Sequence, residues 1–373
     1  MSLQRHLAQR RLRTQIASIA SIASIASIAH IPASRPSITR NAINSCFNKH
    51  IAAARRHHSN TSSFKHQASS HIPSNSQTSQ DQQRIMSDKL VPANPADVMV
   101  IRDITPNITT LSVPFARFGI IDVGGRCTIV RMTGGGVLVF SPVALTAEAA
   151  AVVTRLGGKG GVKYLVAPDI EHHIFLSEWA KAYPAARIIA PQGLAEKRAA
   201  TKGKNPRVNI NDKFFAVLTD KRTQPMCEPQ SIAPDFDADF GLVYFDMHPN
   251  KEVVLLYRPE NILIEADLMF NLPAIEQYQR VDPATRRGAP DRANLANRIF
   301  QAVMRTNGNL VWARRFQWYL ASSSDRARFN EGLRVIDSWP FETIIPCHGE
   351  TITENAKEIF RGVFAWHFAS KDA

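Results

Sequence analysis

The order of apolar runs and helix-like segments is the feature that most constrains the fold of this chain. Short runs rich in Val, Ile and Thr come first, separated by Asn, Pro and Gly: Val98–Ile104, Ile108–Val113, Gly119–Val123, Cys127–Met132 and Val137–Phe140. This spacing predicts the strands of a meander. A helix is expected next over Ala147–Leu156, because Thr146 is a good N-cap and Gly157 and Gly158 follow its last residue.

Strands and helices alternate along the rest of the chain. Further strands are expected at Val162–Ala167, Arg187–Ala190, Phe214–Leu218, Leu242–Met247, Glu252–Tyr257, Asn261–Glu265 and Thr343–Pro346. Helices are expected at Ile174–Tyr183, Leu194–Lys202, Arg292–Arg305, Asp325–Ser338 and Ile352–Phe368. This order predicts an α/β fold in which two sheets pack face to face with helices outside. The proline-containing stretch 203–239 is expected to be an irregular insertion around its one strand.

The first 85 residues differ in composition from everything that follows. They hold 11 of the 45 Lys and Arg residues but only 1 of the 32 Asp and Glu residues, and they are rich in Ser, Ala and Gln. This profile predicts a disordered basic leader over residues 1–85 that targets the protein to the mitochondrion. Disorder without targeting would have the same composition, and a shorter cytoplasmic form that begins at Met86 is a further alternative.

Removing the leader changes what the charge of the chain implies. The net charge falls from +13 for the whole chain to +3 for residues 86–373, so a nucleic-acid partner is not expected. The Ile-Ala-Ser repeat over Ile16–Ala29 has a Ser in every unit and is too short and polar for a membrane span. The four cysteines contain no C-x-x-C pair, which argues against a disulfide framework or a zinc ribbon.

Histidines outside the leader are few and are placed in a pattern. Seven of the 12 histidines lie in residues 1–85. Four of the other five, together with one aspartate, follow or interrupt an expected strand: His172, His173, His248, Asp267 and His348. Polar groups at strand ends can converge on one edge of a sheet, where loops carry chemistry. A His/His/His/Asp/His set of this kind is suited to a divalent metal, although adjacent histidines in a turn are more often simply exposed.

Four short motifs carry a resemblance to a known superfamily. They are L-V-A-P-D-I-E-H-H (165–173), F-D-M-H-P-N-K-E-V (245–253), I-L-I-E-A-D-L-M-F (262–270) and I-I-P-C-H-G-E (344–350). Their order resembles the metallo-β-lactamase fold superfamily over about residues 97–368, and in particular a branch of domains of unknown function (DUF4336-like) with a degenerate first motif. The resemblance implies a four-layer αββα sandwich as the domain of residues 86–373, with the insertion at about 203–239.

The first motif departs from the H-x-H-x-D-H pattern of the superfamily. Pro168 and Ile170 stand where the first two histidines are expected, and His172 stands where the aspartate is expected. The other four positions of the pattern are occupied, by His173, His248, Asp267 and His348. The resemblance therefore implies half of a binuclear centre, with His173, Asp267 and His348 as its core. His172 would replace the missing aspartate, and His248 would lack partners.

The activity that this resemblance implies is hydrolysis at a single metal. We expect a mononuclear metal-dependent hydrolase of a small-molecule ester, thioester or amide, with one Zn²⁺, or alternatively Fe²⁺ or Mn²⁺, as cofactor. Asp267 and His172 would act as ligands that take part in catalysis, and Glu171 would move protons, with Asp169 and Glu350 as alternative carboxylates.

Two other functions are considered because the first motif lacks two histidines and the aspartate of the superfamily pattern. A catalytically degenerate protein that serves as a binding or structural module is the main alternative. An RNA-processing nuclease is disfavoured by the missing H-x-H pair and the low net charge. The sequence leaves the oligomeric state open.

Overall fold

The structure is a computed structural model of the 373-residue chain. It describes residues 95–117, 119, 121–201, 205–219, 230–282 and 295–369. The basic leader expected over residues 1–85 lies outside the described residues. In the part that is described, no helix combines the length and the apolar character that crossing a membrane requires.

A seven-stranded sheet forms one half of the fold, with the strand order β1-β2-β5-β6-β7-β8-β9. Its strands are β1 (Val100–Thr105), β2 (Ile108–Val113), β5 (Gly125–Arg131), β6 (Val137–Phe140), β7 (Val162–Val166), β8 (Arg187–Pro191) and β9 (Phe214–Leu218). The strands from β1 to β6 pair antiparallel, as expected for a meander. The strands from β6 to β9 pair parallel, because helices connect them.

A four-stranded sheet forms the other half, with the order β10-β11-β12-β13. Its strands are β10 (Phe240–Phe245), β11 (Glu252–Tyr257), β12 (Ile262–Glu265) and β13 (Thr343–Pro346). The first three pair antiparallel, whereas β12 and β13 pair parallel and therefore end at the same edge. A small hairpin of β3 (Ala116–Arg117) and β4 (Ile121–Asp122) stands apart from both sheets.

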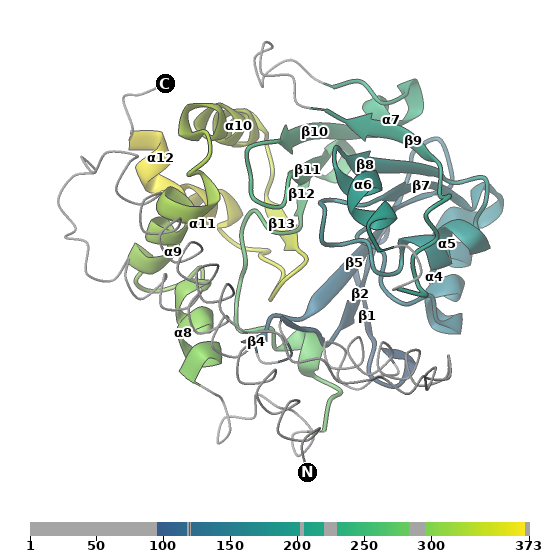
Figure 1. Cartoon of the computed structure of the whole chain (residues 1–373), viewed down its shortest axis with the longest axis horizontal. Coiled ribbons are helices and arrows are strands. Elements are labelled where there is room, and N and C mark those ends of the chain that lie inside the picture. The colour runs from purple at the N-terminus through teal and green to yellow at the C-terminus, as the bar shows by residue number, and fades with distance from the viewer. Residues whose placement is uncertain are drawn as a thin grey trace, which may run out of the picture.

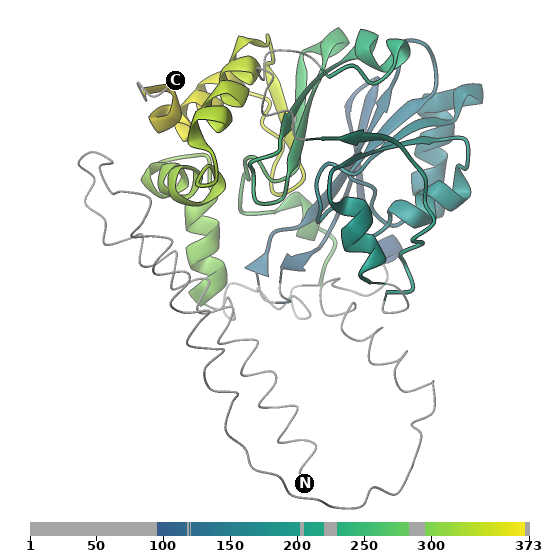
Figure 2. The ribbon, with the colours of Figure 1, turned by 45° about the horizontal axis from the view of Figure 1, so that its top comes forward.

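Helices cover the outer faces of the two sheets. The helices of the described residues are α4 (Ala147–Gly157), α5 (Leu176–Ala182), α6 (Leu194–Ala199), α7 (Pro234–Asp239), α8 (Leu295–Val303), α9 (Val311–Phe316), α10 (Arg326–Ser338), α11 (Ala356–Val363) and α12 (Ala365–Ala369). Two of them differ, because α7 places Phe236 in the core between the sheets and α8 packs beside β4. Short 3₁₀ turns occur at Pro95–Asp97, Gly158–Gly160, Arg258–Glu260 and Glu276–Tyr278, and a π-helical turn, Gln317–Ala321, follows α9. Figures 1 and 2 show α4 and α5 beside the larger sheet and α10 to α12 beside the smaller one.

The pleat of the strands explains why the fold has four layers. In β6, Leu138 and Phe140 point into the core between the sheets, whereas Val137 and Val139 point toward α4. In β10, Leu242 and Tyr244 face the same inter-sheet core, while Val243 and Phe245 face α10 and α11. Both sheets therefore bury apolar side chains on both faces. The αββα sandwich predicted from the sequence is confirmed by these layers.

Most expected elements are found within a few residues of their predicted ends, and the differences are local. The run Gly119–Val123 contributes only β4 to the small hairpin and joins neither sheet. The long helix expected over Ile352–Phe368 is two helices, because the chain turns at Phe364, whose buried ring packs against Phe329 and Phe360. Within the predicted insertion, the strand is present as β9, the edge strand of the larger sheet, but residues 234–239 form helix α7 and are not irregular as expected.

Candidate metal centre

The loops that follow four strands meet at one edge of the sandwich. His172 follows β7, His248 follows β10, Asp267 follows β12 and His348 follows β13. Main-chain hydrogen bonds tie these loops together. Val253 N donates to Pro168 O (2.7 Å), Ile170 N to Asn250 O (3.0 Å) and Cys347 N to Glu265 O (3.0 Å). The two sheets are thus joined at the point where the motif residues lie.

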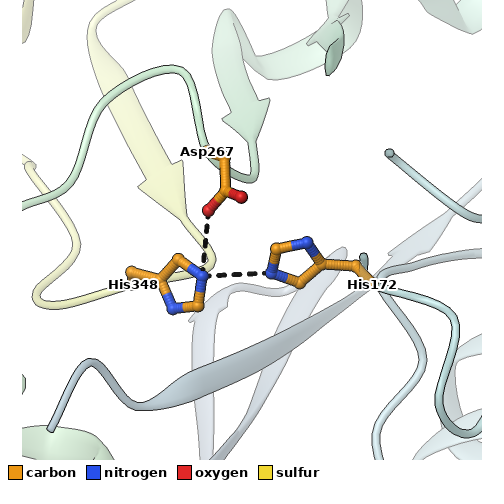
Figure 3. A group of neighbouring side chains, drawn as sticks. All are labelled: His172, Asp267 and His348. Carbon is orange, nitrogen blue, oxygen red and sulfur yellow. Dashed lines mark hydrogen bonds and ion pairs between the residues drawn. The ribbon is translucent and has the colours of Figure 1, made fainter. Parts of the chain in front are cut away.

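Three of the predicted site residues come together as a group (Figure 3): His172, Asp267 and His348, whose ligand atoms lie within 4.8 Å of one another. Nε2 of His348 is 3.1 Å from Nε2 of His172 and 3.1 Å from Oδ1 of Asp267. Asp267 and His348 are buried, and His172 is partly exposed. No other group of this kind is found among the described residues.

The outer nitrogen of each histidine in this group is held by a fixed acceptor. Nδ1 of His348 donates to the main-chain oxygen of Gly124 (2.8 Å), and the ring packs 4.5 Å from the ring of Phe270. Nδ1 of His172 faces Oδ2 of Asp169 at 2.8 Å. Because a neutral imidazole carries one proton, these bonds leave the Nε2 lone pairs of both rings directed into the group. Metal-binding histidines are commonly oriented in this way by a carboxylate or a carbonyl.

Asp169 also shapes the turn that presents His172. Its side chain is fully buried, and Oδ1 accepts the main-chain N–H groups of Glu171 and His172, both at 2.7 Å. The sequence suggested Asp169 as a carboxylate that could move protons. Its three hydrogen bonds instead make it a residue that positions the His172 ring.

One carboxylate oxygen of Asp267 faces the histidines of the group, and the other accepts a hydrogen bond from a residue outside it. Oδ2 accepts a hydrogen bond from Nδ2 of Asn250, whereas the buried Oδ1 faces Nε2 of His348 at 3.1 Å. Its main chain is held by Glu252, whose carboxylate accepts the N–H groups of Ala266 (2.7 Å) and Asp267 (3.0 Å). Two imidazole nitrogens and a carboxylate oxygen at about 3 Å repel one another unless a proton or a metal cation lies between them. The donor set therefore fits a divalent metal.

The pKa shift of His172 indicates that a positive charge is favoured within the group. Burial would lower the pKa of His172, but the negative charges of Asp169 and Asp267 outweigh it and raise that pKa to about 9. For Asp267, burial acts to raise the pKa, and the facing His172 and His348 rings lower it well below its usual value. The shift of His172 reflects the negative charges of Asp169 and Asp267, which favour a positive charge at this point. A metal ion would supply that charge in place of a proton.

His173 lies outside the three-residue group, although the sequence predicted it as one of the three core ligands. Because Asp169 fixes the turn, His172 and not His173 faces Asp267 and His348. His173 is buried, its Nδ1 has no hydrogen-bond partner, and burial together with the charges of Arg198 and Lys197 lowers its pKa to about 4.

His248 and the remaining carboxylates also lie outside the three-residue group. His248 is buried and accepts the N–H of Asn250 at Nδ1 (3.3 Å). Glu171 is half exposed and pairs with Nζ of Lys197 at 2.5 Å. Glu350 accepts the N–H of Glu276 (2.8 Å), which is a structural role. Sequence reasoning missed Asn250 and Glu252, although both lie within the second motif.

A family comparison agrees with the resemblance predicted from the sequence. Residues 117–195 match the domain of unknown function called DUF4336. The resemblance predicted from the sequence is confirmed over this segment. The match includes His172 and His173 and ends before His248, Asp267 and His348. No curated protein matches the chain.

Solved structures of metallo-β-lactamases resemble the chain at low sequence identity. One from Hirschia baltica is 10% identical, with 72% of this chain and 97% of that chain covered and a TM-score of 0.43. One from Pontibacter korlensis is 13% identical, with 73% and 100% covered and a TM-score of 0.42. One from Erythrobacter litoralis, with β-mercaptoethanol in its active site, is 13% identical, with 73% and 97% covered and a TM-score of 0.44. These values support no statement about activity.

Proposed function

We propose that this protein is a mononuclear metal-dependent hydrolase of a small-molecule ester, thioester or amide. One observation carries the proposal: His172 Nε2, Asp267 Oδ1 and His348 Nε2 converge within 4.8 Å of one another, while other residues of the chain hold the second polar atom of each side chain. Two imidazoles and one carboxylate suit Zn²⁺, with Fe²⁺ or Mn²⁺ as alternatives.

At such a site, some residues of the chain would bind the metal, and others would hold these ligands in place. When bound, the metal would supply a Lewis acid that activates water and polarises a carbonyl oxygen. Asp169 and Gly124 hold the two histidine rings in place, and Asn250 and Glu252 fix the Asp267 carboxylate.

Glu171 remains the proposed proton carrier of the site. It shares a turn with His172, and its carboxylate is partly open to solvent.

A second candidate function is a catalytically degenerate binding or structural module. It is favoured by the small number of ligands in the group, because Pro168 and Ile170 stand in the first motif where the superfamily has histidines and neither His173 nor His248 joins the group. Such a protein would fold without metal, and a chelator would leave its melting temperature unchanged.

Metal content separates the two functions. The full chain, purified from its host without chelator or nickel, is expected to hold about one equivalent of a divalent metal by elemental analysis. Asp267→Asn should lose that metal. Asp337→Asn is the matched control, because Asp337 pairs with the exposed Arg361, and it should retain the metal. Folded protein with far less than one equivalent would contradict the hydrolase proposal.

The location of the protein is a separate proposal. The acid-poor leader of residues 1–85 supports import into the mitochondrion, and a start at Met86 would leave a cytoplasmic form. A fluorescent protein fused after residue 373 should therefore accumulate in mitochondria when the full chain is expressed. The same fusion that begins at Met86 should stay in the cytoplasm. Equal distributions of the two fusions would contradict targeting by the leader.

A further inference from the structure

Asn250 is in contact with three of the loops that build the metal centre. Its side-chain Nδ2 donates to Oδ2 of Asp267, and its main-chain N–H donates to Nδ1 of His248 at 3.3 Å. Its main-chain oxygen accepts the N–H of Ile170 at 3.0 Å. A single half-buried residue thus connects the loop of His172, the loop of His248 and the loop of Asp267.

The contact with Asp267 limits what that carboxylate can bind. A carboxylate that bridges two cations needs a free lone pair on each oxygen. Here the amide N–H of Asn250 donates to Oδ2 and so takes up one of the positions at which a second cation could bind. The amide nitrogen offers no lone pair in return. The N–H of Asn250 thus occupies one lone pair of Oδ2, whereas Oδ1 faces Nε2 of His348.

The contact with His248 sets the tautomer of that ring. Because Nδ1 accepts an N–H, the single ring proton of the neutral form lies on Nε2. Nε2 makes no hydrogen bond to another described residue. This nitrogen is therefore an available donor and lacks the lone pair that a metal ligand requires.

We propose that Asn250 stands in place of a second cation, so that the site holds one metal and His248 acts as a hydrogen-bond donor. The inference rests on the proposed metal site and specifies its chemistry. The partner of such a donor is an oxygen that gains negative charge, as the carbonyl oxygen of an ester, thioester or amide does during hydrolysis. His248 would therefore bind substrate, and the metal would be held by the other three residues.

The first test counts metal ions, with Co²⁺ as the probe. The wild-type chain is expected to bind one equivalent of Co²⁺. Asn250→Asp should bind two, because its new carboxylate and Oδ2 of Asp267 would offer two oxygens to a second cation in place of the amide N–H. Asn211→Asp is the matched control, since Asn211 is exposed and outside the centre, and it should bind one.

The outcomes of this test separate the inference from the proposed function. One equivalent in both the wild-type chain and a folded Asn250→Asp variant would overturn the inference and leave the metal site intact. Two equivalents in the wild-type chain would also overturn it. Far less than one equivalent in the wild-type chain would contradict the proposed metal site itself, and the inference with it.

A second test needs no change at Asn250 and does not depend on activity. Long-range ¹H–¹⁵N spectra of the imidazole rings report which nitrogen carries the proton, and the signals that disappear in His248→Gln identify this residue. His248 is expected to be protonated at Nε2 both before and after Zn²⁺ is added. A proton on Nδ1, or loss of the Nε2 proton on addition of Zn²⁺, would overturn the inference.

Metal retention in the variants used for that assignment gives a further check. His248→Gln keeps a side-chain N–H donor and should still bind one equivalent of Zn²⁺. His348→Gln removes a ligand and should lose the metal. Loss of Zn²⁺ from a folded His248→Gln variant would show that His248 is a ligand and would overturn the inference.

Discussion

Replacing Asp169 by asparagine tests how the metal centre is organised. The substitution keeps the size of the side chain and can keep Oδ1 as the acceptor for the N–H groups of Glu171 and His172. It places an NH₂ group where Oδ2 now faces Nδ1 of His172 at 2.8 Å. Two donors then face each other, and the ring of His172 has to adopt the other tautomer. That tautomer carries its proton on Nε2, the nitrogen proposed to bind the metal.

The size of this effect follows from the contact that is lost. Removal of a carboxylate that orients a metal-binding histidine weakens metal binding by about 10–100-fold. That change corresponds to about 1.4–2.7 kcal/mol of binding free energy at 25 °C. Asp169 is fully buried, so solvent cannot replace the lost acceptor, and we expect a value toward the upper end of this range.

Competition for Zn²⁺ with a chromophoric chelator measures the effect directly. The Kd of Asp169→Asn should rise by about 10–100-fold relative to the wild-type chain, with the far-UV circular dichroism unchanged. Asp337→Asn, whose carboxylate pairs with Arg361, should leave the Kd unchanged. A Kd for Asp169→Asn within about twofold of the wild-type value, less than 0.5 kcal/mol, would refute the argued role of Asp169.

Three further predictions concern stability. Burial lowers the pKa of His367 to about 3, below the unfolded value of about 6.5. The stability that its neutral form contributes is therefore complete above about pH 6.5 and is lost as the pH falls toward 3. Urea unfolding at pH 7 and pH 4.5 should show a smaller pH dependence for His367→Asn. Arg126→Met removes the buried partner of Glu276, which keeps its ion pair with the more exposed Arg102, and should lower the free energy of unfolding by about 1–3 kcal/mol, whereas a loss below about 0.5 kcal/mol would contradict this. Gly349→Ala should prevent folding of the His348 loop, because Gly349 has a φ of 88° and an added Cβ would lie 1.9 Å from Asn271 O; a wild-type melting curve would contradict it.

The layers of the fold could be predicted from the sequence because they depend on local patterns. The run Leu242–Phe245 has no polar residue, which is typical of a strand that is buried on both faces, and the structure places it there. The positions of the motifs at strand ends were also visible in the sequence. Sheet geometry alone then brings His172, Asp267 and His348 to one edge.

The details of the site could not be predicted in the same way. His172 and His173 are neighbours of the same type, and only the hydrogen bonds of Asp169 decide which ring faces Asp267. Asn250 lies in a His-Pro-Asn turn, where a polar residue is unremarkable. Its proposed role depends on its hydrogen bond to Asp267, which lies on the loop after a different strand, β12. Such contacts arise from tertiary packing and leave no periodic pattern in the sequence.

The parallel pairing of β12 and β13 has a consequence for how the protein folds. Asp267 and His348 follow adjacent strands, yet helices α8, α9 and α10 lie between them in the sequence. The remaining ligand, His172, follows β7 of the other sheet. Contacts between distant parts of a chain form slowly, because a long loop must close first. We therefore expect metal capture to be a late event in refolding, which makes it a reporter that both sheets have assembled.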